Sequence, residues 1–170
     1  MALRKILTQG DPVLNKRAHA VTSFDRRLGD LIDDMRETLA DADGVGLAAP
    51  QIGILRRVVV VADQDEKMLE LVNPEIIDQS GEQEGLEGCL SVPGYYGEVK
   101  RPNWVKVRAQ DRNGNFFEVE GTEMTARCFC HELAHLEGQL YTEIATRMYT
   151  VEELDEMLEK ESKKGEGKKR

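Results

Sequence analysis

Two histidines in the segment His131-Glu132-Leu133-Ala134-His135 have the spacing of a metal site. Residues four positions apart on an α-helix lie on the same face, one turn apart, so both imidazoles can bind one ion. A carboxylate beside the first histidine, here Glu132, can accept a proton from a metal-bound water molecule. A catalytic metal ion usually has three protein ligands. The pattern therefore predicts hydrolytic metal chemistry and requires a third ligand from elsewhere in the chain.

The residues alone leave that third ligand open. Cys128 is on the same predicted helix, but about 7 Å along its axis from the expected metal position, farther than its side chain and a Zn–S bond comfortably cover. Cys130 points around the helix, so we expect both thiols to be buried. Cys89 comes from a separate, polar segment. Zinc peptidases often use a glutamate on a later helix, where this chain offers Glu152 or Glu153. Histidines that only pack in a core need no third ligand.

Length and composition indicate a globular protein of one domain. The chain has 170 residues, of which 40% are hydrophobic and 32% charged, enough for one domain with a proper core. A net charge of -9 argues against non-specific binding of nucleic acid by the body of the protein. Apolar runs fall short of the roughly 20 residues that span a bilayer, so we expect no membrane segment. Three cysteines without a signal peptide suggest reduced thiols and a cytoplasmic location.

The apolar pattern predicts the elements that position these residues. One stripe at helical period, opened by Ser23 as N-cap, predicts a helix over about 24–41, and a second helix over about 123–137 carries the histidines. A last amphipathic helix is expected over about 150–159. β-Branched or alternating runs predict strands that are most simply antiparallel, at 56–61, 67–77 with a bend at Asn73-Pro74, a short one at 95–100, 104–109 and, after a hairpin turn, 116–119.

The segment from Gly44 to Gly53 is rich in small residues, which allow close approach to another strand or to a ligand. It lacks the glycine spacing of a dinucleotide fingerprint and follows a helix rather than a strand. A phosphate loop is excluded because no lysine and hydroxyl pair follows. Composition alone leaves a tight turn against the core as an equally good interpretation.

Three segments, taken in order, resemble the motifs of the peptide deformylases: Gly44 to Gln51, Glu87-Gly88-Cys89-Leu90-Ser91, and His131 to His135. Their order and separations agree with that family over nearly the whole chain. One position departs from it, because the family usually has aspartate where this chain has Ala134. We hypothesise that this aspartate pairs with a basic residue such as Arg101, which Ala134 leaves to solvent or to another acid.

The resemblance implies an enzyme that removes the formyl group from the amino-terminal methionine of newly made polypeptides and releases formate. The implied metal ligands are Cys89, His131 and His135. Metal-bound hydroxide attacks the formyl carbon, and Glu132 acts as general base and then as general acid. In the family, the side-chain amide of Gln51 and the backbone N–H of Leu90 stabilise the negative charge on the formyl oxygen.

The same resemblance implies the surroundings of the reaction. Glycines such as Gly46 leave room for the peptide backbone, and Val45, Cys128 and the ring of His131 are expected to wall the methionine pocket. The family commonly uses Fe²⁺, with Zn²⁺, Ni²⁺ or Co²⁺ as substitutes. A peptidase that uses Glu152 or Glu153, and a non-catalytic helical module, are the alternatives.

Partners and architecture complete the prediction. The expected partners are N-formylmethionyl nascent polypeptides. For the basic segment from Lys163 to Arg170, a transient contact with ribosomal RNA and a solvated tail that aids solubility both stay open. Pattern and resemblance together predict an α+β fold, with antiparallel β-sheets packed around a central metal-binding helix. A single catalytic domain is expected over 1–160 and a disordered basic tail over 161–170.

Overall fold

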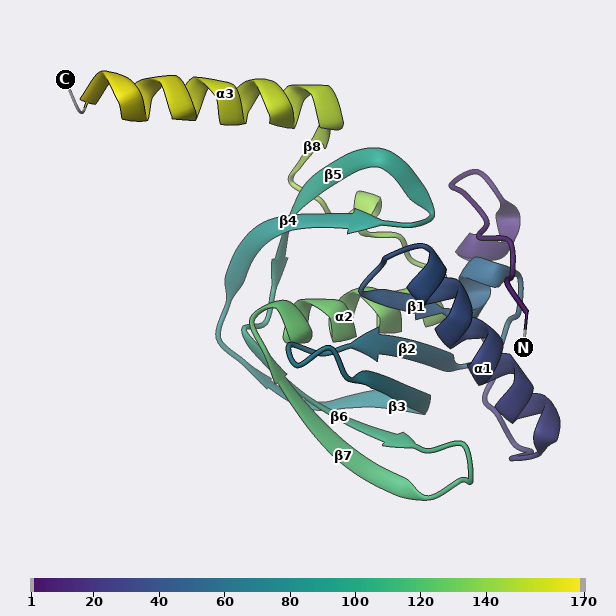
Figure 1. Cartoon of the computed structure of the whole chain (residues 1–170). Coiled ribbons are helices and arrows are strands. Elements are labelled where there is room, and N and C mark those ends of the chain that lie inside the picture. The colour runs from purple at the N-terminus through teal and green to yellow at the C-terminus, as the bar shows by residue number, and fades with distance from the viewer. Residues whose placement is uncertain (1, 169–170) are drawn as a thin grey trace.

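Two antiparallel sheets and a helix between them form the body of the molecule (Figure 1). This computed structural model describes residues 2–168, with side chains described through residue 162. The five-stranded sheet has the order β1-β2-β3-β6-β7, and its strands are β1 (Gly46–Ala48), β2 (Val58–Ala62), β3 (Met68–Ser80), β6 (Trp104–Gln110) and β7 (Phe116–Thr122). The three-stranded sheet has the order β4-β5-β8, with β4 (Gln83–Cys89), β5 (Val92–Arg101) and β8 (Arg147–Thr150).

Within the described residues, three α-helices accompany the sheets, namely α1 (Arg26–Asp41), α2 (Met124–Leu136) and α3 (Val151–Lys168). Three short 3₁₀ helices occupy connections, namely η1 (Pro12–Asn15), η2 (Ala49–Ile52) and η3 (Tyr141–Glu143). None of the helices in the described part of the chain is long and apolar enough to cross a membrane.

Strand β2 is buried on both faces because α1 and α2 cover opposite sides of the five-stranded sheet. Successive side chains of a strand point to opposite faces. Val58 and Val60 accordingly pack in the core cluster that contains the apolar stripe of α1. Val59 and Val61 pack in the cluster that contains Phe129 of α2. This alternation fixes α2, and the histidines that it carries, against the middle of the sheet.

The helices predicted from periodicity are present, with differences at their ends. Helix α1 begins two residues later than its predicted start, because Asp25 and not Ser23 is the N-cap, and its carboxylate accepts the N–H of Leu28 at 3.1 Å. Helix α3 continues to Lys168, so it extends through 161–168, where we expected no regular structure. Residues 169–170 of the predicted tail lie outside the described residues, and the division into a domain and a tail stays a prediction.

The strands were predicted less completely. The bend in β3 is present, since Asn73 has a φ of 50° and the register with β6 shifts between Val72 and Glu75. Strands β1, β4 and β8 were missed. β1 and β8 are too short to show a period, and β4 has a polar, glycine-rich sequence that owes its conformation to pairing with β5.

Candidate active site

Cys89 and the two histidines converge on one point, although Cys89 lies on the three-stranded sheet and the histidines lie on α2. Their ligand atoms all lie within 4.8 Å of one another. The Cys89 sulfur, at the end of β4, lies 3.4 Å from Nε2 of His135. The His131 and His135 rings meet edge to face with centroids 5.1 Å apart, as expected for residues one helical turn apart. The structure therefore brings together the three side chains that the resemblance implies as metal ligands.

The surroundings of these side chains fit a bound cation. Burial lowers the pKa of His131, but the nearby Glu132 carboxylate and the hydrogen bonds to Cys89 and Glu87 outweigh this effect and raise it to about 10. One carboxylate oxygen of Glu132, Oε1, is buried without a hydrogen-bond partner among the described residues. A thiolate with two imidazoles suits Fe²⁺, Zn²⁺, Ni²⁺ or Co²⁺ better than a hard cation such as Mg²⁺. The residues present thus fit the metal that the family requires.

Glu87 orients His131, one of the three candidate metal ligands. Its Oε1 lies 2.7 Å from Nδ1 of His131, and its carboxylate accepts hydrogen bonds from Arg101 at 2.8 and 2.9 Å and from Arg127 at 2.8 Å. Burial raises the pKa of Glu87, but hydrogen bonds from Arg101 and His131 outweigh it and lower the pKa to about 2. An ionised Glu87 favours the proton on Nδ1 of His131, which leaves Nε2 for the metal.

The sequence did not single out Glu87, although a signal was present. It stands two residues before Cys89 on what proves to be one strand, and such residues tend to share a face. Arg101 is buried and pairs with Glu87, so in this chain its acid is Glu87 and it is not left to solvent. Ala134 lies half-buried on α2.

Glu132 reaches the same cavity from α2. Its side chain is buried, and burial is the main reason that its pKa is raised to about 7, while His131 acts in the opposite direction. Gly46 of β1 makes room for it, because a Cβ at that position would collide with the Glu132 carboxylate. The glycine in this segment is therefore required by a close approach to a site residue.

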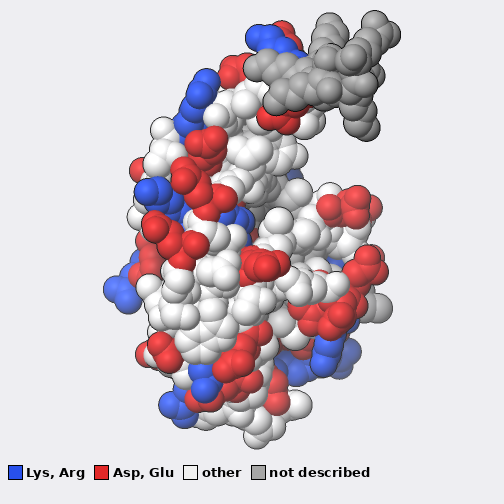
Figure 2. Space-filling model, turned by 90° about the vertical axis from the view of Figure 1, so that its left-hand side faces the viewer, with Lys and Arg blue, Asp and Glu red and all other residues white. Residues whose placement is uncertain are grey.

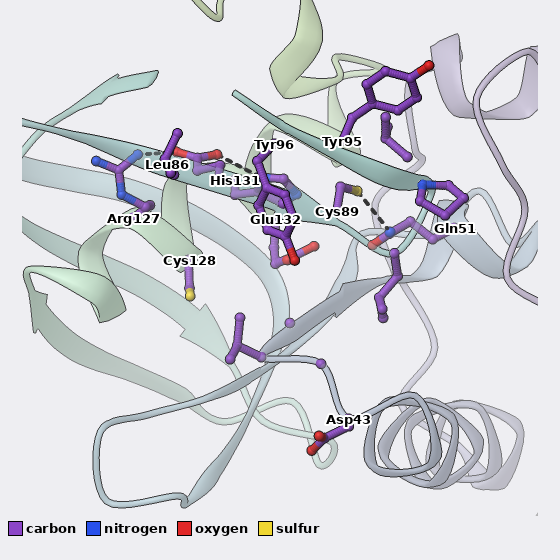
Figure 3. A pocket seen from close by; sticks show the side chains of 18 of the residues that line it. Asp43, Gln51, Leu86, Cys89, Tyr95, Tyr96, Arg127, Cys128, His131 and Glu132 are labelled. Carbon is purple, nitrogen blue, oxygen red and sulfur yellow. Dashed lines mark hydrogen bonds and ion pairs between the residues drawn. The ribbon is translucent and has the colours of Figure 1, made fainter. Parts of the chain in front are cut away.

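Gln51 is fixed on the other side of Cys89 (Figure 3). It lies on η2 and is almost fully buried. Its Oε1 accepts the N–H of Ala48 at 2.9 Å, and its Nε2 donates to Ser91 Oγ at 3.0 Å and to the Cys89 sulfur at 3.5 Å. The side-chain amide N–H thus faces the candidate metal ligands. Leu90, the other predicted oxyanion donor, follows Cys89 and lines the same pocket.

A pocket of about 540 Å³ opens beside these residues. It lies between two strands that are each at the edge of a sheet, β1 and β4. The three predicted wall residues line it, namely Val45, Cys128 and His131, and so does Gly46. The sequence missed several other lining residues, among them Leu86, Tyr95, Tyr96 and Arg127. Burial raises the pKa of Cys128 to about 12, so its thiol stays neutral.

Comparisons with known proteins agree with this geometry. The sequence profile of the polypeptide deformylase family matches residues 3–150. The chain belongs to the peptide deformylase family. The peptide deformylase of Agathobacter rectalis is 56% identical over 143 residues, which cover 84% of this chain and 90% of that protein. Peptide deformylase 1 of Bacillus subtilis is 49% identical over 158 residues, which cover 92% of this chain and 99% of that protein.

Solved structures of deformylases have the same fold. The enzyme from Legionella pneumophila superimposes with a TM-score of 0.82 and 45% identity, covering 85% of this chain and 86% of that one. The enzyme from Thermotoga maritima superimposes with a TM-score of 0.82 and 40% identity, covering 85% of this chain and 99% of that one. The predicted α+β fold is therefore confirmed. Membership of the family also confirms that the chain is an enzyme, whose activity is the metal-dependent removal of the N-formyl group from nascent polypeptides.

Replacing Glu87 by Gln should weaken metal binding and destabilise the fold. Metal affinity should fall about 10- to 100-fold, because the neutral amide of Gln is a weaker acceptor than the carboxylate for the N–H that orients His131. The free energy of unfolding should fall by about 3–5 kcal/mol, since Arg101 and Arg127 keep buried charges without their carboxylate. Competition with a chelator and chemical unfolding measure the two effects. The matched variant Glu84→Gln, which changes an exposed carboxylate on the same strand, should alter neither.

The pH dependence follows from the lowered pKa of Glu87. The stabilisation by its ionised form is fully present above the unfolded-state value of about 4.5 and is lost as the pH falls toward about 2. Glu87→Gln should therefore lose less stability than the unaltered protein over this acid range. If the free energy of unfolding falls by the same amount in both proteins over this acid range, the assignment is contradicted.

Proposed function

We propose that Cys89, His131 and His135 hold the catalytic metal ion, and that Glu132, Gln51 and Leu90 act on the formyl group. The convergence of the three ligand atoms beside the buried Glu132 carboxylate supports this assignment. When bound, the metal lowers the pKa of a coordinated water molecule and polarises the carbonyl that is attacked.

Glu132 moves the proton. Burial brings its pKa to about 7, so the carboxylate can take a proton from water and later give it to the departing amine at neutral pH. One group then acts first as base and afterwards as acid. The unpartnered Oε1 of Glu132 is the atom available to the water molecule.

Gln51 and Leu90 stabilise the charge that develops on the formyl oxygen. Each donor fixed in advance at that oxygen contributes a few kcal/mol to lowering the barrier. The Gln51 N–H lies within 3.5 Å of the Cys89 sulfur, which supports its placement next to the reacting atoms. The Leu90 backbone N–H belongs to the residue after the ligand Cys89.

The substrate peptide binds along the edge of the five-stranded sheet. β1 is an edge strand, so an extended peptide can pair with it as an added strand. At Gly46 of this strand the Glu132 carboxylate takes the space of a Cβ, so a peptide paired with β1 lies beside the proposed proton carrier. Val45 and the neutral thiol of Cys128 then form part of the wall around the amino-terminal methionine side chain.

The assignment is tested with protein purified without oxygen. It should contain a stoichiometric metal ion and release formate from an N-formylmethionyl peptide. Glu132→Gln should keep the metal and lose about 10²- to 10⁴-fold in kcat, because only the proton carrier is removed. Retention of full turnover by this variant would contradict the role of Glu132. Cys89→Ser should lose metal; unchanged metal content would instead support a peptidase with an acidic third ligand.

We propose Fe²⁺ as the metal in the cell, with Zn²⁺, Ni²⁺ or Co²⁺ as substitutes. A thiolate ligand makes the site open to oxidation, and iron adds a second oxidisable centre. The iron form should therefore lose activity in air faster than the nickel form. The measurement compares the half-lives of both forms under oxygen together with the oxidation state of Cys89. Equal half-lives would contradict a metal-dependent inactivation.

We further propose a cytoplasmic enzyme whose basic tail, Lys163 to Arg170, makes a transient contact with ribosomal RNA. The face of the molecule in Figure 2 carries acidic side chains on both sides of a hollow below α3, and the first turns of α3 are also acidic. The net charge of -9 disfavours RNA binding by the body of the protein, whereas the tail is a basic segment that attracts RNA phosphates. Deletion of 163–170 should abolish a salt-sensitive cosedimentation with ribosomes; unchanged cosedimentation would contradict the contact.

A further inference from the structure

The Ser91 hydroxyl is a buried group for which the reaction scheme so far has no use. Ser91 is fully buried in the connection between β4 and β5, two residues after Cys89. Its Oγ accepts a hydrogen bond from Nε2 of Gln51 at 3.0 Å. A serine here therefore contacts the proposed oxyanion donor directly, although it contributes no atom to the proposed metal site.

The contacts of the Gln51 amide select a single orientation. The N–H of Ala48 can only donate, so its partner at 2.9 Å must be the carbonyl oxygen Oε1. Ser91 Oγ accepts from the other end of the amide, which must then be the NH₂ group. Both contacts place the nitrogen toward Cys89, 3.5 Å from its sulfur. An inverted amide would present a carbonyl oxygen where negative charge develops and would oppose the reaction.

The backbones of Gln51 and Ser91 are tied to the same strap, which we define as residues 7–9. The N–H of Leu7 donates to the carbonyl of Gln51 at 2.7 Å, and the N–H of Gln9 donates to the carbonyl of Ser91 at 2.7 Å. Gln51 belongs to η2, and Ser91 belongs to the connection between β4 and β5. The strap therefore holds two segments that are far apart in the sequence next to each other. The hydrogen bond between their side chains thus joins parts that are already aligned.

We propose that Ser91 is a positioning residue, whose hydroxyl holds the Gln51 amide N–H toward the formyl oxygen. The inference rests on the proposed role of Gln51 as an oxyanion donor. Oxyanion donors accelerate a reaction because they are oriented before charge develops. A glutamine without this restraint spreads over several rotamers, and only a fraction of the molecules would present the donor.

A double-mutant cycle on kcat in the metal-loaded enzyme tests the inference. Gln51→Ala should lower kcat by about 10²-fold, the usual effect of losing one oxyanion donor. Ser91→Ala should lower kcat by about tenfold with KM and metal content little changed. In the Gln51→Ala background, Ser91→Ala should change kcat less than about twofold, because the group through which it acts is absent.

The outcomes separate the two claims. If Gln51→Ala leaves kcat unchanged, the oxyanion role of Gln51 fails and this inference fails with it. If Gln51→Ala has its expected effect but Ser91→Ala lowers kcat equally in both backgrounds, or in neither, only the role of Ser91 is overturned. Ser91→Cys, which keeps the size and a weaker acceptor, should fall between serine and alanine in kcat, and the reverse order would also overturn it.

Two further measurements separate positioning from folding. Thr38, on α1, has another buried hydroxyl, which accepts the backbone N–H of Arg4 at 3.0 Å. Thr38→Val removes this hydroxyl and should leave kcat unchanged. In the zinc-loaded protein, the side-chain NH₂ signals of Gln51, assigned by their loss in Gln51→Ala, should exchange with solvent faster in Ser91→Ala. Unchanged exchange would show that Ser91 does not restrain the amide and would overturn the proposal.

Discussion

The hydrogen bonds of the Glu87 carboxylate join three elements of the structure. It belongs to β4, Arg101 belongs to β5, and Arg127 and His131 belong to α2. Removing these groups from water costs free energy, which is recovered only while all the partners are in place. The three-stranded sheet is therefore held against α2 by a contact that also orients His131, a proposed metal ligand. Packing of the fold and geometry of the site depend on the same carboxylate.

The site combines rigid elements with one exposed side. Helix α2 is buried along most of its length and lies against a sheet whose β2 valines pack on both faces. Cys89 lies at the end of a strand and Gln51 lies on a 3₁₀ helix, so neither is held by a long regular element. The hydrogen bonds of Gln51 and those of the Glu87 carboxylate hold this part of the site in place. The pocket between β1 and β4 leaves strand edges available for an extended peptide.

The sequence predicted the features that depend on neighbouring residues better than those that depend on contacts between distant parts of the chain. The stripe of α1 and the spacing of His131 and His135 are local patterns, and both helices were found. Cys89 lies 46 positions from His135, so only the resemblance to a family identified it among the candidates. Glu87, Ser91 and strand β4 were missed as functional or structural features, because their roles arise from partners far away in the chain. Asp25 displaced Ser23 as N-cap, since nearby capping residues compete and the pattern does not rank them.

The convergence of Cys89 with the helix histidines has a consequence for the life of the protein in the cell. If Cys89 and His135 hold the metal ion as proposed, its binding closes a loop between positions 46 apart in the sequence, across two sheets. Such a closure removes conformational freedom from the unfolded chain, and the free energy of metal binding becomes part of the free energy of folding. The abundance of this enzyme is then coupled to metal supply. A shortage of metal leaves molecules that are inactive and, in addition, more exposed to proteolysis.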